Sequence, residues 1–373
     1  MRVALVSDVV YPYHKGGKER RLDEVSRRLA SAGHDVHIYT MKWWEGENDK
    51  TVNGVHMHAI CKKYELYQGE RRSIKEGIMF ALACFKMFGK KFDVAEVDHM
   101  PYFPLYSMWF VCLLKRRPML ATWHEVWGRE YWKTYMGGLS GTIAYLIERF
   151  SIFLPKQFVA VSPYTARRLH EEYGVKAARI ITSTNGTNLD VIKEAPIAKN
   201  GSDIVYVGRL LAHKNVDMLI RAVKTLSKDM PSVSCVIVGK GPEAEPLKKL
   251  VKELDLSKNV RILPPIESSR DLFSTMKAGK VFVFPSEREG FGLIALEAGA
   301  CGLPILTLND PGNATVDLVT PGKNGDVFND EAELVTLLKK YLAKKSSRTA
   351  IEKFAQKYDW DHTVIPLLER YAS

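Results

Sequence analysis

The chain has 373 residues, with 54 Lys and Arg against 43 Asp and Glu, and 46% of its residues are hydrophobic. Its length exceeds the size at which a single core usually stops growing, so the sequence predicts two domains. The composition excludes a disordered chain, a collagen-like chain and a disulfide-rich miniprotein. The five cysteines are scattered without a C-x-x-C pair, which is typical of a reducing compartment and implies neither a disulfide nor a zinc framework.

The N-terminal residues, MRVALVSDVV, lack the apolar core and the small cleavage-site residues of a secretion signal. The longest apolar stretch of the first half, Pro101 to Leu114, has about 14 residues and ends at three basic residues, whereas a spanning helix needs about 20. The sequence therefore predicts a cytoplasmic chain without a membrane span.

Positive charge is concentrated in the first half, where residues 1–190 hold 28 Lys and Arg against 20 Asp and Glu. The basic clusters lie beside aromatic and aliphatic residues, as on surfaces that meet anionic headgroups. No recognition helix, zinc finger or RNP strand accompanies them, so a membrane or an anionic substrate is favoured over nucleic acid. An ordinary solvated basic surface is an equal alternative.

Short apolar runs alternate with helical patterns along the chain, which predicts an α/β fold with parallel sheets covered by helices. A helix is expected from about Lys18 to Ala32, where Gly33 ends it. Strands are expected at residues 2–7, 35–40, 93–97, 119–123, 158–161 and 180–183, and then at 204–207, 235–238, 260–263, 281–284 and 305–308.

Residues 190–202 lose this periodicity and gain Pro, Gly and Asn, as linkers do. The expected domains are therefore 1–190 and 203–358, with ligand-binding loops that face each other across a cleft. Residues 359–373 are expected to form a C-terminal helix. Packing of this helix back on the N-terminal domain is one option that periodicity leaves open.

Three strand-to-helix turns carry residues suited to an anionic ligand. Gly16 and Gly17 follow the first strand and would let backbone N–H groups approach an anion at a helix N-terminus. Arg209 leaves a strand and Lys214 enters the next helix, so both could converge on one diphosphate. A third turn, with Gly239 and Gly241, is tight and is followed by a proline. Taken singly, each has an ordinary explanation as a turn or as exposed charge.

The segment EGFGLIALE is the most informative part of the sequence. Glu289 lies in a loop whose glycines expose backbone N–H groups, and Glu297 projects from a largely apolar helix. A carboxylate in such a helix needs a partner. Paired hydroxyls of a sugar or a ribose are suitable partners, because an ionised carboxylate accepts two hydrogen bonds.

These runs together carry a family resemblance. GRLLAHKN, VGKGP, EGFGLIALE and NGTNLD, with the early Gly-Gly turn, resemble the family 4 retaining glycosyltransferases, also called glycosyl transferases group 1. The resemblance covers nearly the whole chain and implies the GT-B fold, with two facing Rossmann-like domains. It also implies transfer of a hexose with retained configuration, from GDP-mannose or a UDP-sugar, to a glycan or a polyprenyl- or other lipid-linked acceptor.

The resemblance implies roles for particular positions. Arg209 and Lys214 match the positions that hold the donor diphosphate, Glu289 the acid that binds donor-sugar hydroxyls, and Glu297 the acid that binds the ribose. His124, after a first-domain strand, matches the histidine beside the donor sugar, with a satisfied core histidine as the competing interpretation. The other expected donor-binding positions are the loop residues Gly290, Phe291 and Gly292 and the turn residues Gly16, Gly17, Gly239 and Gly241.

No metal and no other cofactor is expected, because Arg and Lys already match the diphosphate. The chain's Asp-x-Asp, Asp359-Trp360-Asp361, lies between two C-terminal helices, where an N-cap Asp is the ordinary explanation. His99 suits the acceptor side as well as it suits the core. Two other functions remain as alternatives: a nucleotide-sugar epimerase on the same scaffold, and a non-catalytic nucleotide-sugar-binding protein.

Two apolar stretches with basic ends, 74–91 and 101–117, bear on the acceptor. One interpretation is peripheral contact with an anionic membrane at its inner face, which would bring the enzyme to a lipid-linked acceptor. The other is that both stretches are core helices of the first domain.

Overall fold

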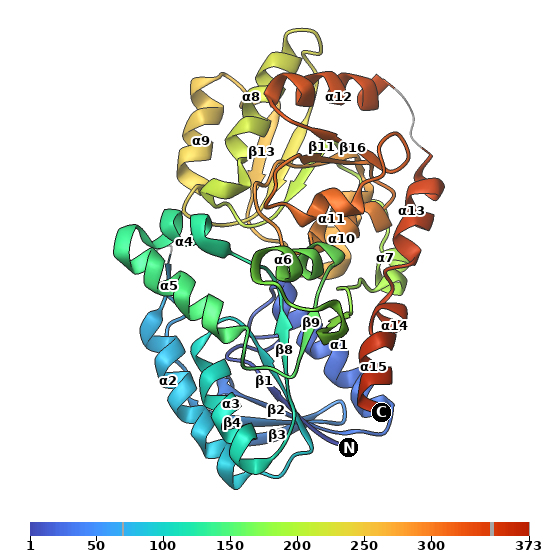
Figure 1. Ribbon diagram of the computed structural model, residues 1–373. Coiled ribbons are helices and arrows are strands. Elements are labelled where there is room, and N and C mark those ends of the chain that lie inside the picture. Colours follow the sequence, from blue (N-terminus) through green and yellow to red (C-terminus); the bar gives the residue numbers. More distant parts are fainter. Residues whose placement is uncertain (69–70, 344–346, 373) are drawn as a thin grey trace. The chain divides into compact units, whose positions relative to one another are not determined.

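The computed structural model describes residues 1–68, 71–343 and 347–372. The chain divides into two compact units, Met1–Asn185 with Trp360–Ser373, and Gly186–Asp359 (Figure 1). The first boundary precedes the 190–202 segment, because the short helix α7, Leu189–Glu194, belongs to the second unit. Ile192 in this helix is buried in the core of that unit.

An eight-stranded sheet forms the centre of the first unit, with the order β10-β9-β8-β7-β1-β2-β4-β3. All neighbouring strands are parallel except β3 and β4. All six strands that the sequence predicts for this half are present. The strands are β1 Arg2–Val6, β2 Asp35–Lys42, β3 Asp49–Val52, β4 Val55–Lys62, β7 Val94–Asp98, β8 Met119–Trp123, β9 Gln157–Ala160 and β10 Ile180–Thr182.

The hairpin of β3 and β4 is a feature that the expectation of purely parallel pairing missed. The two strands are joined at Asn53 and Gly54, both of which have positive φ, 50° and 77°. An Asn-Gly pair is the strongest short-range sequence signal for such a turn. The run VNGV therefore indicated the hairpin in the sequence. Strand β3 itself is mostly exposed and polar, so no run of apolar residues marks it.

Helices cover both faces of the first sheet, because its central strands are apolar on both sides. In β1, Val3 and Leu5 join one core with α1, whereas Ala4 and Val6 join the other with α2 and α3. A small hairpin of β5, Tyr67–Gln68, and β6, Arg71–Arg72, precedes α2. The helices are α1 Gly17–Ser31, α2 Ile74–Cys84, η1 Phe85–Gly89, α3 Phe103–Lys115, α4 Gly128–Met136, α5 Gly138–Ser151, α6 Pro163–Tyr173 and η2 Ala177–Arg179.

The second unit contains a six-stranded, fully parallel sheet with the order β13-β12-β11-β14-β15-β16. The five strands predicted for this half are present, and β16 is an additional edge strand. The strands are β11 Ser202–Val207, β12 Cys235–Val238, β13 Val260–Leu263, β14 Gly279–Phe284, β15 Ile305–Leu308 and β16 Gly325–Phe328. The helices are η3 Ala212–Lys214, α8 Val216–Ser227, α9 Ala244–Glu253, α10 Ser269–Lys277, α11 Leu293–Ala300, η4 Ala314–Leu318, α12 Glu331–Ala343 and α13 Arg348–Gln356.

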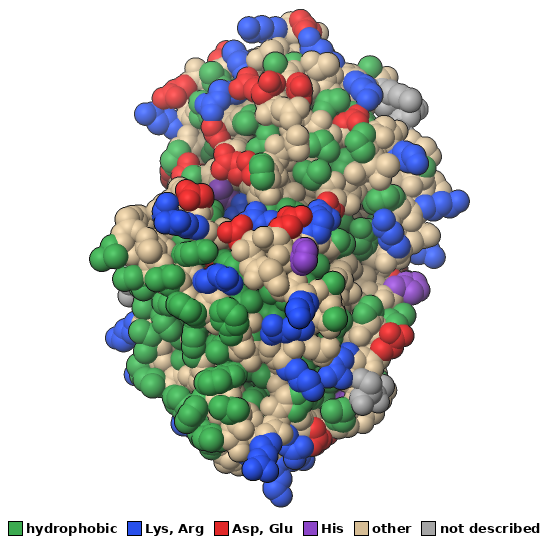
Figure 2. All heavy atoms as spheres, viewed as in Figure 1, with side chains coloured by type: hydrophobic (Ala, Val, Ile, Leu, Met, Phe, Trp, Pro, Cys, Tyr) green, Lys and Arg blue, Asp and Glu red, His purple; other side chains and the backbone are tan. Residues whose placement is uncertain are grey.

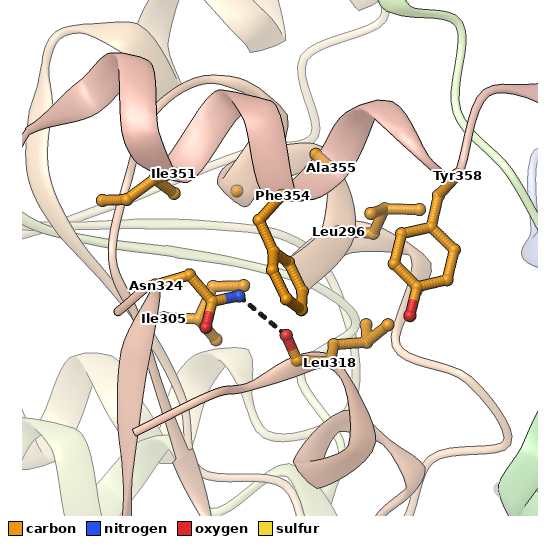
Figure 3. Close-up of a pocket in the computed structure, with 9 residues that line it drawn as sticks. Leu296, Ile305, Leu318, Asn324, Ile351, Phe354, Ala355 and Tyr358 are labelled. Atoms are coloured by element: carbon orange, nitrogen blue, oxygen red, sulfur yellow. Dashed lines mark hydrogen bonds between the residues drawn. The ribbon is translucent and has the colours of Figure 1, made fainter. Parts of the chain in front are cut away.

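Helix α13 packs against α11 on this unit, as Figure 3 shows. Ile351, Phe354 and Ala355 of α13, with Tyr358 after it, lie over Leu296 of α11 and over Ile305 of β15. The space left between them is about 10 Å³, which is too small for a substrate. This seam therefore fixes α13 in place and is not a ligand site.

The last residues of the chain return to the first unit as α14, Trp360–Thr363, and α15, Ile365–Ala372. Figure 1 shows the red α15 beside the blue α1. Trp360, Leu367 and Tyr371 are buried in the core that contains α1. The hydroxyl of Tyr371 donates a hydrogen bond to the buried Glu96 on β7. No helix in the described part of the chain is long and apolar enough to cross a bilayer.

We expect Tyr371→Phe to lower the free energy of unfolding by about 1–3 kcal/mol, because it removes a donor from a buried carboxylate. Urea unfolding followed by fluorescence measures this. Tyr11→Phe, at an exposed tyrosine, is the matched control and should leave the free energy unchanged. Equal stability of the Tyr371 variant and the wild type would show that α15 is held without this bond.

Candidate active site

Charged side chains gather at one point in each sheet. At this point the strands that follow along the chain change from one side of the first strand to its other side. In the second unit, β11 is followed along the chain by strands on one side, and then by β14 on its other side. In the first unit, β1 is followed by β2 on one side and later by β7 on the other. Loops that leave the carboxyl ends of such strands diverge and form a crevice suited to a ligand. Most of the site residues expected from the sequence fall on these loops.

Lys214 and Glu289 form a buried ion pair where β11 and β14 meet. Lys214 ends the turn η3, and Glu289 follows β14; their side chains are 9% and 15% exposed. The Nζ of Lys214 donates a hydrogen bond to Oε1 of Glu289. Burial lowers the pKa of Lys214; Glu289 opposes this effect, and the charges of Arg209 and Arg288 add to it. Three cations and one carboxylate therefore act on each other at this point.

Arg209 is exposed at the carboxyl end of β11, and its backbone carbonyl accepts a hydrogen bond of 3.1 Å from the hydroxyl of Tyr206. Arg288 is a residue that the sequence analysis missed. It lies in the loop SEREG directly before Glu289, where a charged residue looks like ordinary surface. Its effect on Lys214 becomes visible only when the two loops are brought together.

Hydrogen bonds hold the loop after β11 against the loop after β14. The backbone N–H of Glu287 donates to the carbonyl of His213 at 3.0 Å, and the side-chain amide of Asn215 donates to the Glu287 carboxylate at 3.0 Å. The N–H of Glu289 donates to the carbonyl of Gly312 at 3.0 Å, which ties the same loop to the chain beyond β15. The ion pair therefore lies on a framework whose backbone is fixed on both sides.

Gly239 and Gly241 follow β12 and lie against the loop that carries Arg209. A Cβ atom at Gly239 would stand 1.9 Å from the carbonyl oxygen of Gly208, and one at Gly241 would stand 2.0 Å from that of Leu210. No other residue fits at this distance. These glycines therefore bring two carboxyl-end loops together, which is a structural role in addition to the donor-binding role implied by the resemblance.

The loop Gly290–Gly292 leads into α11, whose first residue is Leu293. Gly292 has a φ of +86° and lies close to Thr315, so a side chain there is excluded both by the backbone and by space. The Phe291 ring is 5% exposed and packs edge-on against Tyr358 at 5.9 Å between centroids. Phe291 can therefore contribute only its backbone to a ligand, which agrees with a loop that presents N–H groups.

Glu297 lies in the middle of α11 and is 3% exposed. Its neighbours in the helix, Leu296 and Ala298, belong to the apolar core of the second unit. A carboxylate in this position is costly unless it is held by hydrogen bonds. The sequence singled out Glu297 as an acid in a largely apolar helix, and the structure shows that this acid is buried.

In the first unit, Asp8 lies at the centre of a buried group of charges beyond β1. Lys18 of α1 and Arg72 of β6 both donate hydrogen bonds to its carboxylate, whose side chain is 0% exposed. Glu76 of α2 lies 3.4 Å from Arg72, and burial raises the pKa of Glu76. None of these four residues was expected from the sequence, although an Asp directly after an apolar strand is a signal that could have found Asp8.

His124 follows β8 and is paired with Asp98, which ends β7. Its Nε2 lies 2.8 Å from Oδ1 of Asp98. Burial alone would raise the pKa of Asp98, but Lys18 and His124 hold it well below its usual value. The imidazole of His124 is 15% exposed, so it is neither a solvent-facing residue nor a core residue. It is a histidine oriented by a carboxylate, as general acid–base and hydrogen-bonding groups commonly are.

His99 is buried next to this pair. It is 1% exposed and stacks on Trp123 with 4.8 Å between ring centroids, and burial lowers its pKa to about 3. Its Nδ1 accepts a 3.3 Å hydrogen bond from the backbone N–H of His124, so the hydrogen of the neutral ring is on Nε2. That atom has no hydrogen-bond partner among the described residues.

Gly16 and Gly17 stand at the start of α1, with Gly16 as its N-cap. Gly16 has no side chain that could cap the first turn. Lys18, the next residue after Gly17, belongs to the group of charges around Asp8. The Glu19 carboxylate of the first turn lies against Gly16, so a negative group already stands at this helix N-terminus.

The Asp359-Trp360-Asp361 segment leads into α14, the first of the two C-terminal helices of the first unit. Asp361 is hydrogen-bonded to Arg28 of α1, with 2.7 Å from its Oδ1 to Nη2 of the arginine. Trp360 is buried as the first residue of α14. The segment therefore serves to attach the C-terminal helices to the first unit.

Comparisons with known proteins agree with this arrangement. The family described as Glycosyltransferase Family 4 matches residues 15–191, and the one described as Glycosyl transferases group 1 matches residues 189–358. D-inositol 3-phosphate glycosyltransferase from Jonesia denitrificans is 31% identical over 95% of this chain and 91% of that protein. The enzyme of the same name from Gordonia bronchialis is 30% identical, but the match spans 58% of this chain and about half of the relative, 52%.

Two solved structures show the same fold. Sucrose-phosphate synthase from Thermosynechococcus elongatus has a TM-score of 0.80 at 19% identity, covering 100% of this chain and 98% of that one. The Anabaena protein HepE, in complex with UDP and glucose, has a TM-score of 0.74 at 16% identity and full coverage of both chains. Two parallel-sheet α/β units of this kind form the GT-B fold. The chain belongs to the group 1 glycosyltransferases, family 4.

We expect acidification to destabilise the first unit through His99. The unfolded chain binds a proton at His99 near pH 6.5, whereas the folded chain does so only near pH 3, so stability is lost as the pH falls between these values. The slope reaches about 1.4 kcal/mol per pH unit. Urea unfolding of the wild type and His99→Asn at several pH values measures this. The variant should have the shallower slope, and His362→Asn, at an exposed histidine, should follow the wild type. Identical slopes for all three would contradict the burial of a neutral His99.

Proposed function

We propose that the chain is a retaining, metal-independent hexosyltransferase that uses a nucleotide-diphosphate sugar, GDP-mannose or a UDP-sugar, as donor. The observation that carries this proposal is the cluster of Arg209, Lys214 and Glu289 where β11 and β14 meet. A diphosphate needs fixed positive charge, and a sugar needs a carboxylate acceptor for its hydroxyls. The UDP and glucose bound by the HepE structure support the same choice of ligand.

Departure of the nucleoside diphosphate builds negative charge on the β-phosphate, which the cluster can stabilise. Lys214 is buried, so its attraction to a phosphate is weakened little by water. Arg209 presents a planar fork that suits two phosphate oxygens. The N–H groups of Gly290 to Gly292 add donors at the start of α11. These groups are held in place before the donor arrives, so they need little reorganisation during the reaction.

Retention of configuration is proposed to follow from attack on the same face that the leaving group departs. No side chain of the cluster is assigned as a covalent nucleophile, because Glu289 is paired with Lys214 and is better suited to holding sugar hydroxyls. His124, oriented by Asp98, is proposed to hydrogen-bond the donor sugar. Glu297 is proposed to bind the ribose.

Arg209→Ala tests the donor site without disturbing the core, since Arg209 is exposed. We expect kcat to fall by about 10²–10³, the usual effect of removing one preorganised donor to a developing negative charge. The assay measures transfer and donor hydrolysis with a panel of GDP-mannose and UDP-hexoses, on glycan, lipid-linked and inositol phosphate acceptors. The anomeric configuration of the product is read by NMR. Lys248→Ala, at an exposed lysine of α9, is the control.

Each outcome of this panel is decisive. Unchanged activity of Arg209→Ala, or an inverted product, contradicts the proposal. Conversion of the donor without any acceptor indicates the epimerase, and a thermal shift by a donor without turnover indicates the binding protein. Activity should persist in EDTA, because the two cations take the place that a divalent metal occupies in other glycosyltransferases.

We further propose that the acceptor is lipid-linked and that the enzyme works at an anionic membrane surface. Figure 2 shows hydrophobic side chains gathered over α2, α3 and α5 of the first unit. The inner sides of α2 and α3 are core, as Phe80, Leu105 and Met108 are buried. Their outer sides are exposed and apolar. We call this surface the apolar face; it includes Leu82, Phe85, Phe110, Leu114, Leu146 and Phe150.

The distribution of charge supports a membrane as the partner of the apolar face. Glu76 and Glu148 are the acidic residues of α2, η1, α3 and α5, and both are 0% exposed. Lysines and arginines stand at the ends of the same helices, at Lys90, Lys91 and Arg117 among others. A groove of about 450 Å³ between α3 and α5, lined by Phe103, Tyr106 and other apolar residues, is open to an acyl or prenyl chain. An apolar surface with a basic rim matches an anionic bilayer.

The triple variant Leu82→Ser, Phe110→Ser, Phe150→Ser should reduce binding to vesicles with anionic lipid, because it removes exposed apolar area from all three helices. Vesicle sedimentation measures the bound fraction, with neutral vesicles as the comparison. Val52→Ser with Ile197→Ser, at exposed apolar residues elsewhere, is the control. Equal binding of the wild type to neutral and anionic vesicles would rule out the proposed surface.

A further inference from the structure

Three histidines and two aspartates form a cluster at the edge of the first sheet, outside the proposed active site. His37 on β2 is in register with His56 on β4, and Asp49 on β3 is in register with His58 on β4. The rings of His37 and His56 stack at 4.8 Å between centroids, and those of His37 and His58 at 5.1 Å. Neither the proposed donor site nor the apolar face uses these side chains.

Hydrogen-bond distances connect four of these residues in one chain. Nδ1 of His58 lies 2.9 Å from Asp49 Oδ1, His58 Nε2 lies 2.8 Å from His37 Nδ1, and His37 Nε2 lies 2.8 Å from Asp35 Oδ1. Both ends of this series of hydrogen bonds are carboxylates, which only accept hydrogen bonds. Three bonds in series therefore require three N–H hydrogens. Two neutral imidazoles supply only two.

The third hydrogen, or a metal ion in its place, adds positive charge between the two carboxylates. Both carboxylates already accept a hydrogen bond: Asp35 from Arg2 Nε at 2.6 Å, and Asp49 from His58 Nδ1 at 2.9 Å. A third proton would make one imidazole cationic, whereas a metal ion on His37 Nε2 would leave both imidazoles neutral. With hydrogens on His58 Nδ1 and His37 Nδ1, the lone pair of His37 Nε2 faces the Asp35 carboxylate. These two acceptor atoms, His37 Nε2 and Asp35 Oδ1, lie 2.8 Å apart and attract a positive ion between them.

We propose that this edge of the sheet binds a divalent transition-metal ion of the Zn²⁺ class through His37 Nε2, His56 Nε2 and Asp35 Oδ1. These three atoms lie within 4.8 Å of one another, so small side-chain rotations bring them to one ion. Two imidazoles and one carboxylate are a donor set that Zn²⁺ accepts, with water in the fourth position.

The neighbours of the three ligands fit this assignment. Ligand imidazoles usually donate their other N–H to a fixed acceptor. His37 does so to His58, which in turn donates to Asp49. His56 Nδ1 lies 3.0 Å from the hydroxyl of Thr51, which can accept from it. Each ligand ring therefore has a partner that leaves its Nε2 lone pair for the metal.

The place of the cluster indicates a structural ion and not a catalytic one. Asp35 and His37 lie at the start of β2, whereas Asp8 and Asp98 lie at the carboxyl ends of β1 and β7. A metal here would join β4, which carries the β3 hairpin, to β2. It should stabilise the first unit and leave sugar transfer unchanged, so this inference stands or fails independently of the proposed function.

The test uses the full chain after treatment with EDTA and desalting. Calorimetric titration with Zn²⁺ should show one site, and thermal unfolding should shift upward in its presence. Co²⁺ should give the visible spectrum of a site with nitrogen and oxygen donors. His56→Gln should weaken Zn²⁺ binding by at least about tenfold, and His58→Gln, which removes a partner of a ligand, by about tenfold. His362→Gln, an exposed histidine outside the cluster, should bind as the wild type does.

Three results would overturn the proposal. The first is Zn²⁺ binding that is the same in His56→Gln as in the wild type. The second is a sulfur charge-transfer band with Co²⁺, which would place the ion on a cysteine such as Cys61 on β4. The third is a wild type that binds no Zn²⁺ while His37 titrates with an NMR pKa near neutrality, which would show that a proton supplies the charge.

Discussion

The arrangement of the second unit depends on the burial of Lys214 against Glu289. A buried ammonium is stable only when a carboxylate and fixed neighbours compensate for the water it has lost. The loop hydrogen bonds around Glu287 and Glu289 provide that fixed surrounding. A pair held in this way is strongly responsive to an additional anion, since little water screens it. The same feature that costs folding energy is the one on which the proposed diphosphate site rests.

In the first unit, buried charges are compensated by a larger group of oppositely charged side chains. Asp8 accepts from both Lys18 and Arg72, and the same lysine lies 3.7 Å from Asp98. Through Asp98 this network reaches His124, so the orientation of one histidine depends on α1, β1 and β6 together. The two units thus use the same principle, with paired charges at the carboxyl ends of central strands. In each, the loops diverge where the winding reverses.

Different parts of the first unit are suited to different partners. The carboxyl ends of its strands hold the charged group, the outer sides of α2, α3 and α5 form the apolar face, and the starts of β2 and β4 carry the histidine cluster. Helix α2 carries both Glu76 of the charged group and Leu82 of the apolar face, whereas the histidine cluster lies on β2, β3 and β4. The membrane, metal and donor experiments change side chains on different elements, at Leu82, His56 and Arg209 among others, so their results can be interpreted independently.

The sequence by itself determined the α/β class, eleven of the strands and the motifs of the family, because these depend on local periodicity and on short runs such as EGFGLIALE. It also showed that Glu297 is an acid in an apolar helix. Tertiary structure alone decided which distant charges meet, namely Arg288 with Lys214 and Asp98 with His124. It also decided that the β3–β4 hairpin pairs with β2. Such contacts depend on strand order, which places loops far apart in the chain at the same edge of a sheet, and no local pattern encodes that order.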